Sequence, residues 1–147
     1  MKLGMNAKLY RHKTGTPNTW EEIANVKDLT LNLESGEADV TTRANSGWKA
    51  TVGTLNEASI EFEMIWDEAD VNFAAIQEAY FDKSKTLKLA VMSGDIAVAG
   101  SQGLVAVCAI TKFSRSEPLA EAMTVSVTCK PTYAAVAPSW EQSPVAA

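Results

Sequence analysis

The clearest pattern in the sequence is the strict alternation of polar and apolar positions over residues 57–67. Every even position from Ala58 to Trp66 is apolar, whereas five of the six odd positions are polar. Because successive side chains of a β-strand point to opposite faces, this alternation predicts a strand with one core face and one wet, acidic face. Such a strand spans about 36 Å, which is long for a globular protein.

Two further segments, residues 28–34 and 124–130, alternate in the same way. We expect them to share one sheet with residues 57–67 and to present a common polar face. Residues 86–92 and 104–113 are apolar almost throughout, which indicates strands covered on both faces or nearly so. A short strand over residues 7–12 is expected to join an edge of the sheet.

One segment has helical spacing instead. Phe73, Ile76 and Tyr80 recur at helical intervals within residues 71–81, and Asp70 stands where an N-cap is preferred. This helix falls between two predicted strands, so we expect it to pack across the back of a sheet. Together these elements predict a mainly β fold, a β-sandwich or rolled barrel with one flanking α-helix.

The connections are long and irregular. Residues 35–56 contain several glycines and no regular period, which predicts a long protruding loop or an open hairpin, with residues 38–43 able to extend a strand. Residues 93–103 are rich in glycine and predict turns, and residues 114–121, with Pro118, predict a sharp corner. Residues 132–147 contain Pro138, Pro144 and an isolated Trp140, and we expect them to build no core of their own.

Three tryptophans fall in predicted loops or near the chain ends, namely Trp20, Trp48 and Trp140. Tryptophan is frequent at the centre of protein interfaces, because it offers a large apolar area with few rotatable bonds. An interface role and local packing on the surface of the subunit are equally compatible with these positions.

Composition narrows the functional classes. A chain of 147 residues with 46% apolar and 21% charged residues suits one folded domain. A net charge of −5 argues against a protein that grips nucleic acid, since phosphate binding needs a cationic patch. No uncharged apolar run is long enough for a membrane helix, and the first residues do not resemble a secretory signal.

Candidate chemistry is sparse. The carboxylates of Glu57, Glu61, Glu63 and Asp67 form a row, but neighbours two residues apart on a strand are about 7 Å apart, and no His or Cys lies nearby in sequence. This row therefore favours a solvated face over a metal or catalytic site. The single histidine, His12, has no nucleophile or metal motif around it.

Other signals of catalysis or cofactor binding are weak as well. Gly94, Gly100 and Gly103 do not match a phosphate-binding fingerprint, and we expect no cofactor. Cys108 and Cys129 fall on strands that we expect to be adjacent. Buried free thiols are the default expectation, and a cross-strand disulfide would need an oxidising compartment.

Several segments, in this order and spacing, resemble the major tail tube proteins of long-tailed bacteriophages. They are Val40–Arg43, the Gly47-Trp48 pair, residues 60–67 with the helix that follows, and residues 113–119 followed by residues 124–130. The resemblance covers most of residues 5–133. That family is similar in fold to secretion-system tube proteins. The resemblance implies a ring-forming tail-tube fold over residues 1–133, in which residues 35–56 would form an arm between rings. Residues 134–147 would form an extended C-terminal tail.

The resemblance also implies a structural role in the virion tail, after assembly in the host cytoplasm. By this resemblance, six copies would close into a ring, and rings would stack into a tube. The wet face would then line the bore through Asp28, Thr30, Asn32, Glu34, Glu57, Ser59, Glu61, Glu63, Thr124, Ser126 and Thr128. Contacts between subunits and rings would come from Val40, Arg43, Asn45, Trp48, Lys49, Val52 and Trp140.

The implied partners are other copies of the chain, and the tape measure, tail tip and terminator proteins of the tail. DNA would pass through the acidic bore without specific binding, and no membrane insertion is expected. Two alternatives stay open: a single-ring tail terminator or completion protein, and a soluble β-sandwich that binds a ligand on an exposed sheet. An enzyme is disfavoured, because no site for catalysis is evident.

Overall fold

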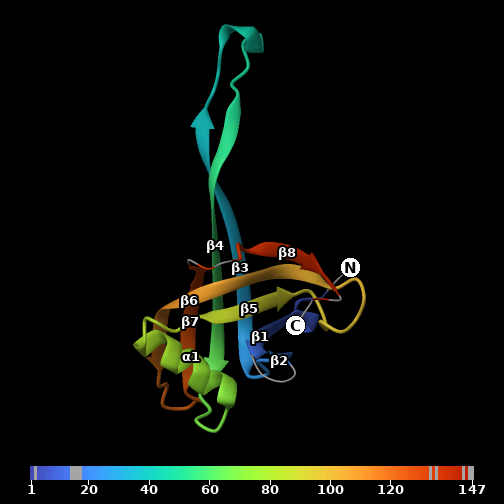
Figure 1. Ribbon diagram of the computed structural model, residues 1–147. Coiled ribbons are helices and arrows are strands. Elements are labelled where there is room, and N and C mark those ends of the chain that lie inside the picture. Colours follow the sequence, from blue (N-terminus) through green and yellow to red (C-terminus); the bar gives the residue numbers. More distant parts are fainter. Residues whose placement is uncertain (2, 14–17, 133, 135, 144, 146–147) are drawn as a thin grey trace.

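The computed structural model describes residues 1–147 apart from residues 2, 14–17, 133, 135, 144 and 146–147. In this described part the chain forms eight strands, one α-helix and two short 3-10 helices (Figure 1). Their bounds, in chain order, are η1 (Gly4–Asn6), β1 (Lys8–Lys13), β2 (Thr19–Glu22), β3 (Val26–Asp39), η2 (Arg43–Asn45), β4 (Thr51–Ile65), α1 (Val71–Phe81), β5 (Leu87–Met92), β6 (Gln102–Ser116), β7 (Thr124–Pro131) and β8 (Ser139–Gln142).

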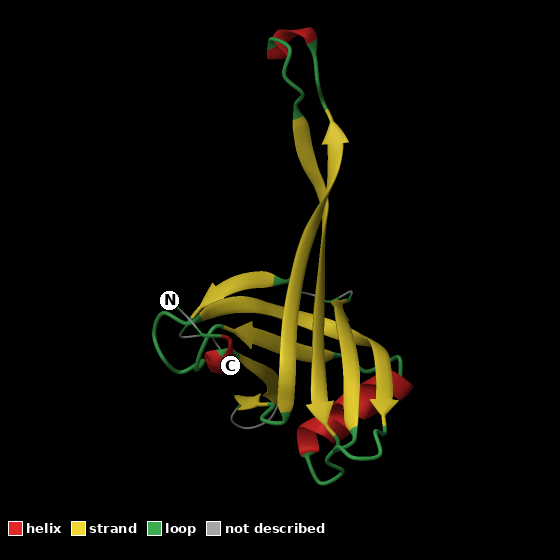
Figure 2. Ribbon diagram, turned by 180° about the vertical axis from the view of Figure 1, so that it is seen from behind, coloured by secondary structure: helices red, strands yellow, loops and turns green. Residues whose placement is uncertain are grey.

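All eight strands belong to one antiparallel sheet, in the order β2-β1-β5-β6-β7-β4-β3, with β8 paired to β6 beside this path. The sheet is rolled, so that Leu9 of β1 and Ile60 of β4, from distant parts of the strand order, share one core cluster. Figure 2 shows the strands curving around this core, with α1 across its lower end. The predicted mainly β fold with one flanking helix is confirmed, and its form is the rolled sheet.

The predicted alternation holds in β4. Ile60, Phe62 and Met64 are buried, whereas Glu61 between them is exposed. Pairing with β3 on one side and β7 on the other makes β4 an interior strand, so its core face is continued by its neighbours. The main core therefore forms where three alternating segments bring their apolar faces together.

The two continuously apolar runs are also explained. In β5, Leu87, Leu89 and Val91 enter the main core, whereas Ala90 and Met92 enter a second cluster with Tyr10. Both faces of the strand are thus covered, as the sequence predicted. The neighbouring strand β6 is buried in the same way over its first half.

The helix begins where its cap predicts. The side chain of Asp70 accepts a hydrogen bond of 2.8 Å from the backbone N–H of Asn72. Phe73 is buried, with its ring edge-on to Trp66 and 6.0 Å from Phe113 between ring centroids. The buried Asn72 accepts from Arg11 Nε at 2.8 Å, which ties the helix to β1.

Of the two forms expected for residues 35–56, the structure has the open hairpin: residues 35–39 belong to β3 and residues 51–56 to β4, because backbone pairing in a hairpin does not require an apolar face. Two other details differ from expectation. The corner predicted at residues 114–121 starts only after Ser116, where β6 ends. Trp20 and Trp140 lie in the short strands β2 and β8 rather than in loops, since four-residue polar segments carry too little pattern to be recognised.

Candidate assembly surfaces

The exposed face of β3, β4, β7 and β6 is the first candidate surface, and we call it the polar face. Strand register aligns its residues in rows across the sheet, for example Thr30, Glu61 and Thr128. All eleven residues that the sequence analysis assigned to a bore are exposed or half-buried on these strands. Since directly opposite residues point to the same side of a sheet, they form one continuous surface.

Cations share this face with the carboxylates. Lys112 stands directly opposite Thr128. Lys130 lies two residues after Thr128 on β7 and therefore on the same face of the sheet. Lys27 lines a shallow groove together with Glu63. Five of the eleven residues assigned to the bore carry carboxylates, and they share the polar face with the ammonium groups of these three lysines. The face is therefore less acidic than the sequence analysis expected.

The position of Lys112 on the polar face is not indicated by the sequence pattern, for a structural reason. It follows an almost wholly apolar run, and a register shift between Ile110 and Lys112 marks a β-bulge. A bulge inserts an extra residue and so changes which side chains face outward. No alternation in the sequence signals this change.

Residues 35–56 form the second candidate surface, which we call the arm. The paired ends of β3 and β4 rise clear of the body and carry η2 at their end (Figures 1 and 2). From Ser35 to Glu37 the register advances by two residues on β3 and by three on β4, which gives β4 a bulge opposite Gly36. A β-carbon at Gly36 would lie 2.4 Å from Thr54 Oγ1, so glycine permits the close approach of the strands.

The arm tip, residues 40–50, is closed by local hydrogen bonds. The Thr41 hydroxyl accepts from the backbone N–H of Ala50 at 2.9 Å, and the Val40 N–H donates to the Ala50 carbonyl at 3.0 Å. Ser46 and Gly47 turn the chain with φ of 52° and 84°. Glycine adopts this left-handed region without steric cost, which explains its place there.

The arm exposes an unusual amount of apolar surface. Trp48 is 79% exposed and Leu55 82% exposed, and Val40 and Val52 are each about half exposed. An apolar set projecting into solvent is typical of a surface that another molecule covers. Of the seven residues expected at interfaces, six lie on the arm, whereas Trp140 lies on β8, where its Nε1 donates to Gln102 Oε1 at 3.0 Å.

A groove of about 750 Å³ lies at the root of the arm, and we call it the root groove. Leu33 and Ala58 of the arm strands line it together with Leu104 and Pro131 of β6 and β7. Glu34 and Glu57, which stand directly opposite each other, line it as well. No local pattern in the sequence indicates this groove, because its walls come from segments far apart in the chain.

The histidine and the two cysteines lie in packed surroundings. His12 packs edge-on against Trp20, and its pKa is lowered by burial and by the nearby Lys88. Cys108 and Cys129 are buried free thiols, and burial raises the pKa of Cys108 to about 12 and raises that of Cys129 also. No group of three or more His, Cys, Asp or Glu residues in the described part of the chain is arranged to hold a metal ion.

Membrane insertion through a helix has no candidate in the described residues, since none of their helices combines the length and the apolarity that a bilayer crossing requires. What the molecule offers instead is a rolled sheet with a broad polar face and a projecting apolar arm. These features define the class of protein as a building block of a larger assembly.

Comparison with known proteins identifies the assembly. The phage tail tube protein family model matches residues 5–132, so the chain belongs to the phage tail tube protein family. It is therefore a structural protein of the virion tail and not an enzyme. None of the curated protein sequences matches it significantly.

Solved structures share the fold at low sequence identity. The tail of an empty gene transfer agent (GTA) particle, refined as a helix with C6 symmetry, superimposes with a TM-score of 0.71 at 18% identity, over 96% of this chain and 99% of the other. The SPP1 tail tube gives 0.66 at 15% identity, over 88% of this chain and 75% of the other. The baseplate of the anti-feeding prophage gives 0.60 at 9% identity, over 94% of both chains.

Proposed function

We propose that this chain forms rings, each of six copies, that stack into a hollow tail tube through which phage DNA passes. The observation that carries the proposal is the arm, which projects from the body with its apolar residues uncovered. Such a projection is suited to contact with a copy in the next ring. The C6 symmetry of the similar GTA tail supports six copies per ring.

Edge strands support ring formation. The strand order ends at β2 and β3, and the edge of β3 extends over fourteen residues. An unpaired edge of this length is a template for association with another chain, unless it is covered. Lateral contact between copies around an axis would cover it and extend the sheet from one subunit to the next.

The polar face is the surface that we assign to the bore, with all eleven residues from Asp28 to Thr128 named above. Within one subunit its carboxylates outnumber its ammonium groups by two, so this face of the subunit has a net negative charge. At physiological salt the screening length is about 8 Å, so repulsion of phosphate acts only close to the wall. A wall of this kind disfavours adhesion of DNA without blocking its passage.

The remaining partners follow from this role. The tape measure protein would occupy the bore during assembly, and the tail tip and terminator proteins would contact the two ends of the tube. A single ring is the competing function, and the arm argues against it, because a lone ring leaves the apolar residues of the arm exposed on one side.

Electron microscopy of the purified protein tests the proposal. We expect hollow tubes with six-fold symmetry, either spontaneously or after addition of a tail tip complex as initiator. Single rings under both conditions would favour the terminator role, and monomers under both conditions would contradict the assembly role of this chain.

A further inference from the structure

We infer that the arm tip of one copy binds in the root groove of a copy in the next ring, with Arg43 and Lys49 against Glu34 and Glu57. This inference rests on the proposed stacking of rings and names the two surfaces that meet. In the assembled tube this contact would compensate the charges of Glu34 and Glu57, and repulsion of DNA by the polar face would then depend on the carboxylates of Asp28, Glu61 and Glu63.

The root groove carries an unbalanced pair of carboxylates. Glu34 and Glu57 are exposed and directly opposite across the β3–β4 pair, a position in which like charges repel. Lys130 also lines the groove, which leaves a net charge of −1. Among the ion pairs of the described residues, none includes Glu34 or Glu57.

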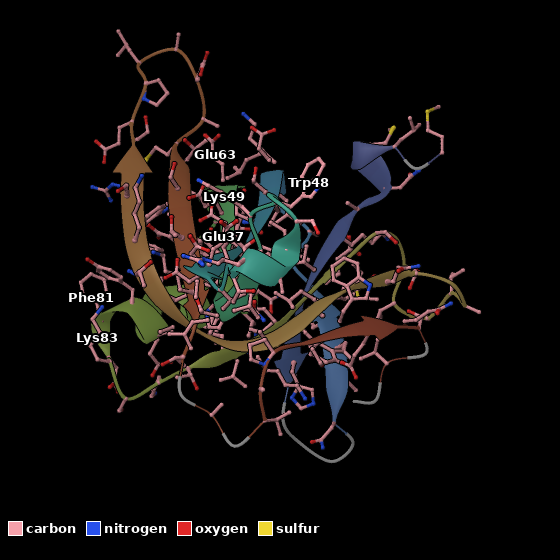
Figure 3. All side chains as sticks on the ribbon, turned by 90° about the horizontal axis from the view of Figure 1, so that it is seen from above. Glu37, Trp48, Lys49, Glu63, Phe81 and Lys83 are labelled. Atoms are coloured by element: carbon pink, nitrogen blue, oxygen red, sulfur yellow. The ribbon has the colours of Figure 1, made fainter. Side chains whose placement is uncertain are left out.

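The arm tip has the opposite charge. Arg43 and Lys49 are its charged residues; both are exposed, and neither takes part in an ion pair between described residues. Figure 3, which looks down the arm, shows Trp48 and Lys49 at its end, with Trp48 directed away from the strands. The tip therefore combines a charge of +2 with an uncovered indole ring.

The two surfaces match in apolar character as well. Leu33, Leu104 and Pro131 supply apolar walls to the groove. An indole ring buries a large apolar area, and its edge N–H can meet a polar rim. A groove of about 750 Å³ has room for one such ring together with the ends of two cationic side chains.

Within one chain these surfaces cannot meet. The β3 strand continues from Ser35 at the groove to Asp39, and the tip begins beyond it, so paired backbone separates them by at least about 13 Å. Contact must therefore involve two copies. A contact between two different patches excludes a closed pair, and where it joins copies of successive rings it can repeat along the axis, which is the geometry of a growing tube.

Charge reversal tests this pairing. We expect the R43E/K49E variant and the E34K/E57K variant each to lose at least ten-fold in the fraction of protein that sediments as tubes. The variant with all four substitutions restores opposite charges and should recover to within two-fold of the wild type. Glu121→Lys makes the same change of charge in the corner after β6, outside the arm and the root groove, and is the matched control that should assemble normally.

Circular dichroism first establishes that every variant is folded. If the four-fold variant fails to fold, an equimolar mixture of the two double variants supplies both complementary contacts and should form tubes. Normal assembly of either double variant, or no recovery in the four-fold variant and the mixture, would overturn the pairing while wild-type tubes leave the proposed function standing. Absence of tubes from the wild type would instead contradict the proposed function.

Discussion

Shortening the arm separates assembly from folding in the most direct way. Asp39 and Thr51 are opposite residues at the end of the β3–β4 pair, so residues 40–50 can be replaced by Asn-Gly, which suits a two-residue hairpin turn. We expect a folded subunit that does not form tubes, because the shortened chain lacks the residues assigned to ring stacking.

The expected change in stability follows from the structure. Every residue of the tip is exposed or half-buried, so no core contact is lost. The hydrogen bonds between Thr41, Val40 and Ala50 are lost, at about 1 kcal/mol each. Closing a loop of two residues in place of eleven returns about 1.5 kcal/mol of chain entropy. The free energy of unfolding should thus stay within about 1.5 kcal/mol of the wild type, and the melting temperature within about 5 °C.

The assay compares three proteins at equal concentration by urea unfolding, sedimentation and negative-stain microscopy. The third protein keeps the length of the tip but replaces residues 40–50 with glycine and serine, which distinguishes the chemistry of the tip from its reach. Tubes of normal length from the shortened variant would refute the role of the arm. A loss of several kcal/mol in stability would refute the claim that the arm is independent of the core.

Three further outcomes are expected. Phe73→Ala, in the core, should lower the free energy of unfolding by about 3–5 kcal/mol in urea titration. Phe81→Ala, at an exposed position of the same helix, should change it by less than about 0.5 kcal/mol. Equal losses would contradict the assigned helix face. In a phage, Glu61→Lys with Glu63→Lys should leave tube assembly intact and reduce infectivity at least ten-fold, with the matching pair of Gln substitutions less severe; unchanged infectivity would count against a bore at this face. Burial raises the pKa of the two cysteine thiols in the folded chain. Above about pH 9 the unfolded chain therefore loses these protons while the folded chain keeps them. The free energy of unfolding should then fall by about 1.4 kcal/mol per pH unit for each thiol. Urea titrations at pH 8 and pH 10 measure this effect, and a variant with both cysteines replaced by alanine should lack it.

The arm illustrates how far a local pattern reaches. Ile60 and Met64 could be assigned to a core face from the sequence, because alternation is a property of a few neighbouring residues. Residues 51–56 of the same strand have no alternation, since neither of their faces is buried. Pairing with the end of β3 keeps them extended, and a pattern of hydrophobicity cannot reveal pairing that buries nothing.

The sequence by itself determined the strands with one apolar and one polar face, the helix with its Asp70 cap, and the lack of a catalytic motif, because each depends on residues close together in the chain. Only the tertiary structure decided the order of strands, the outward turn of Lys112 at a bulge, and the groove that Leu33 forms with Leu104 and Pro131. These features arise from hydrogen bonds and contacts between segments distant in sequence, and the pattern of a few neighbouring residues does not reveal such contacts.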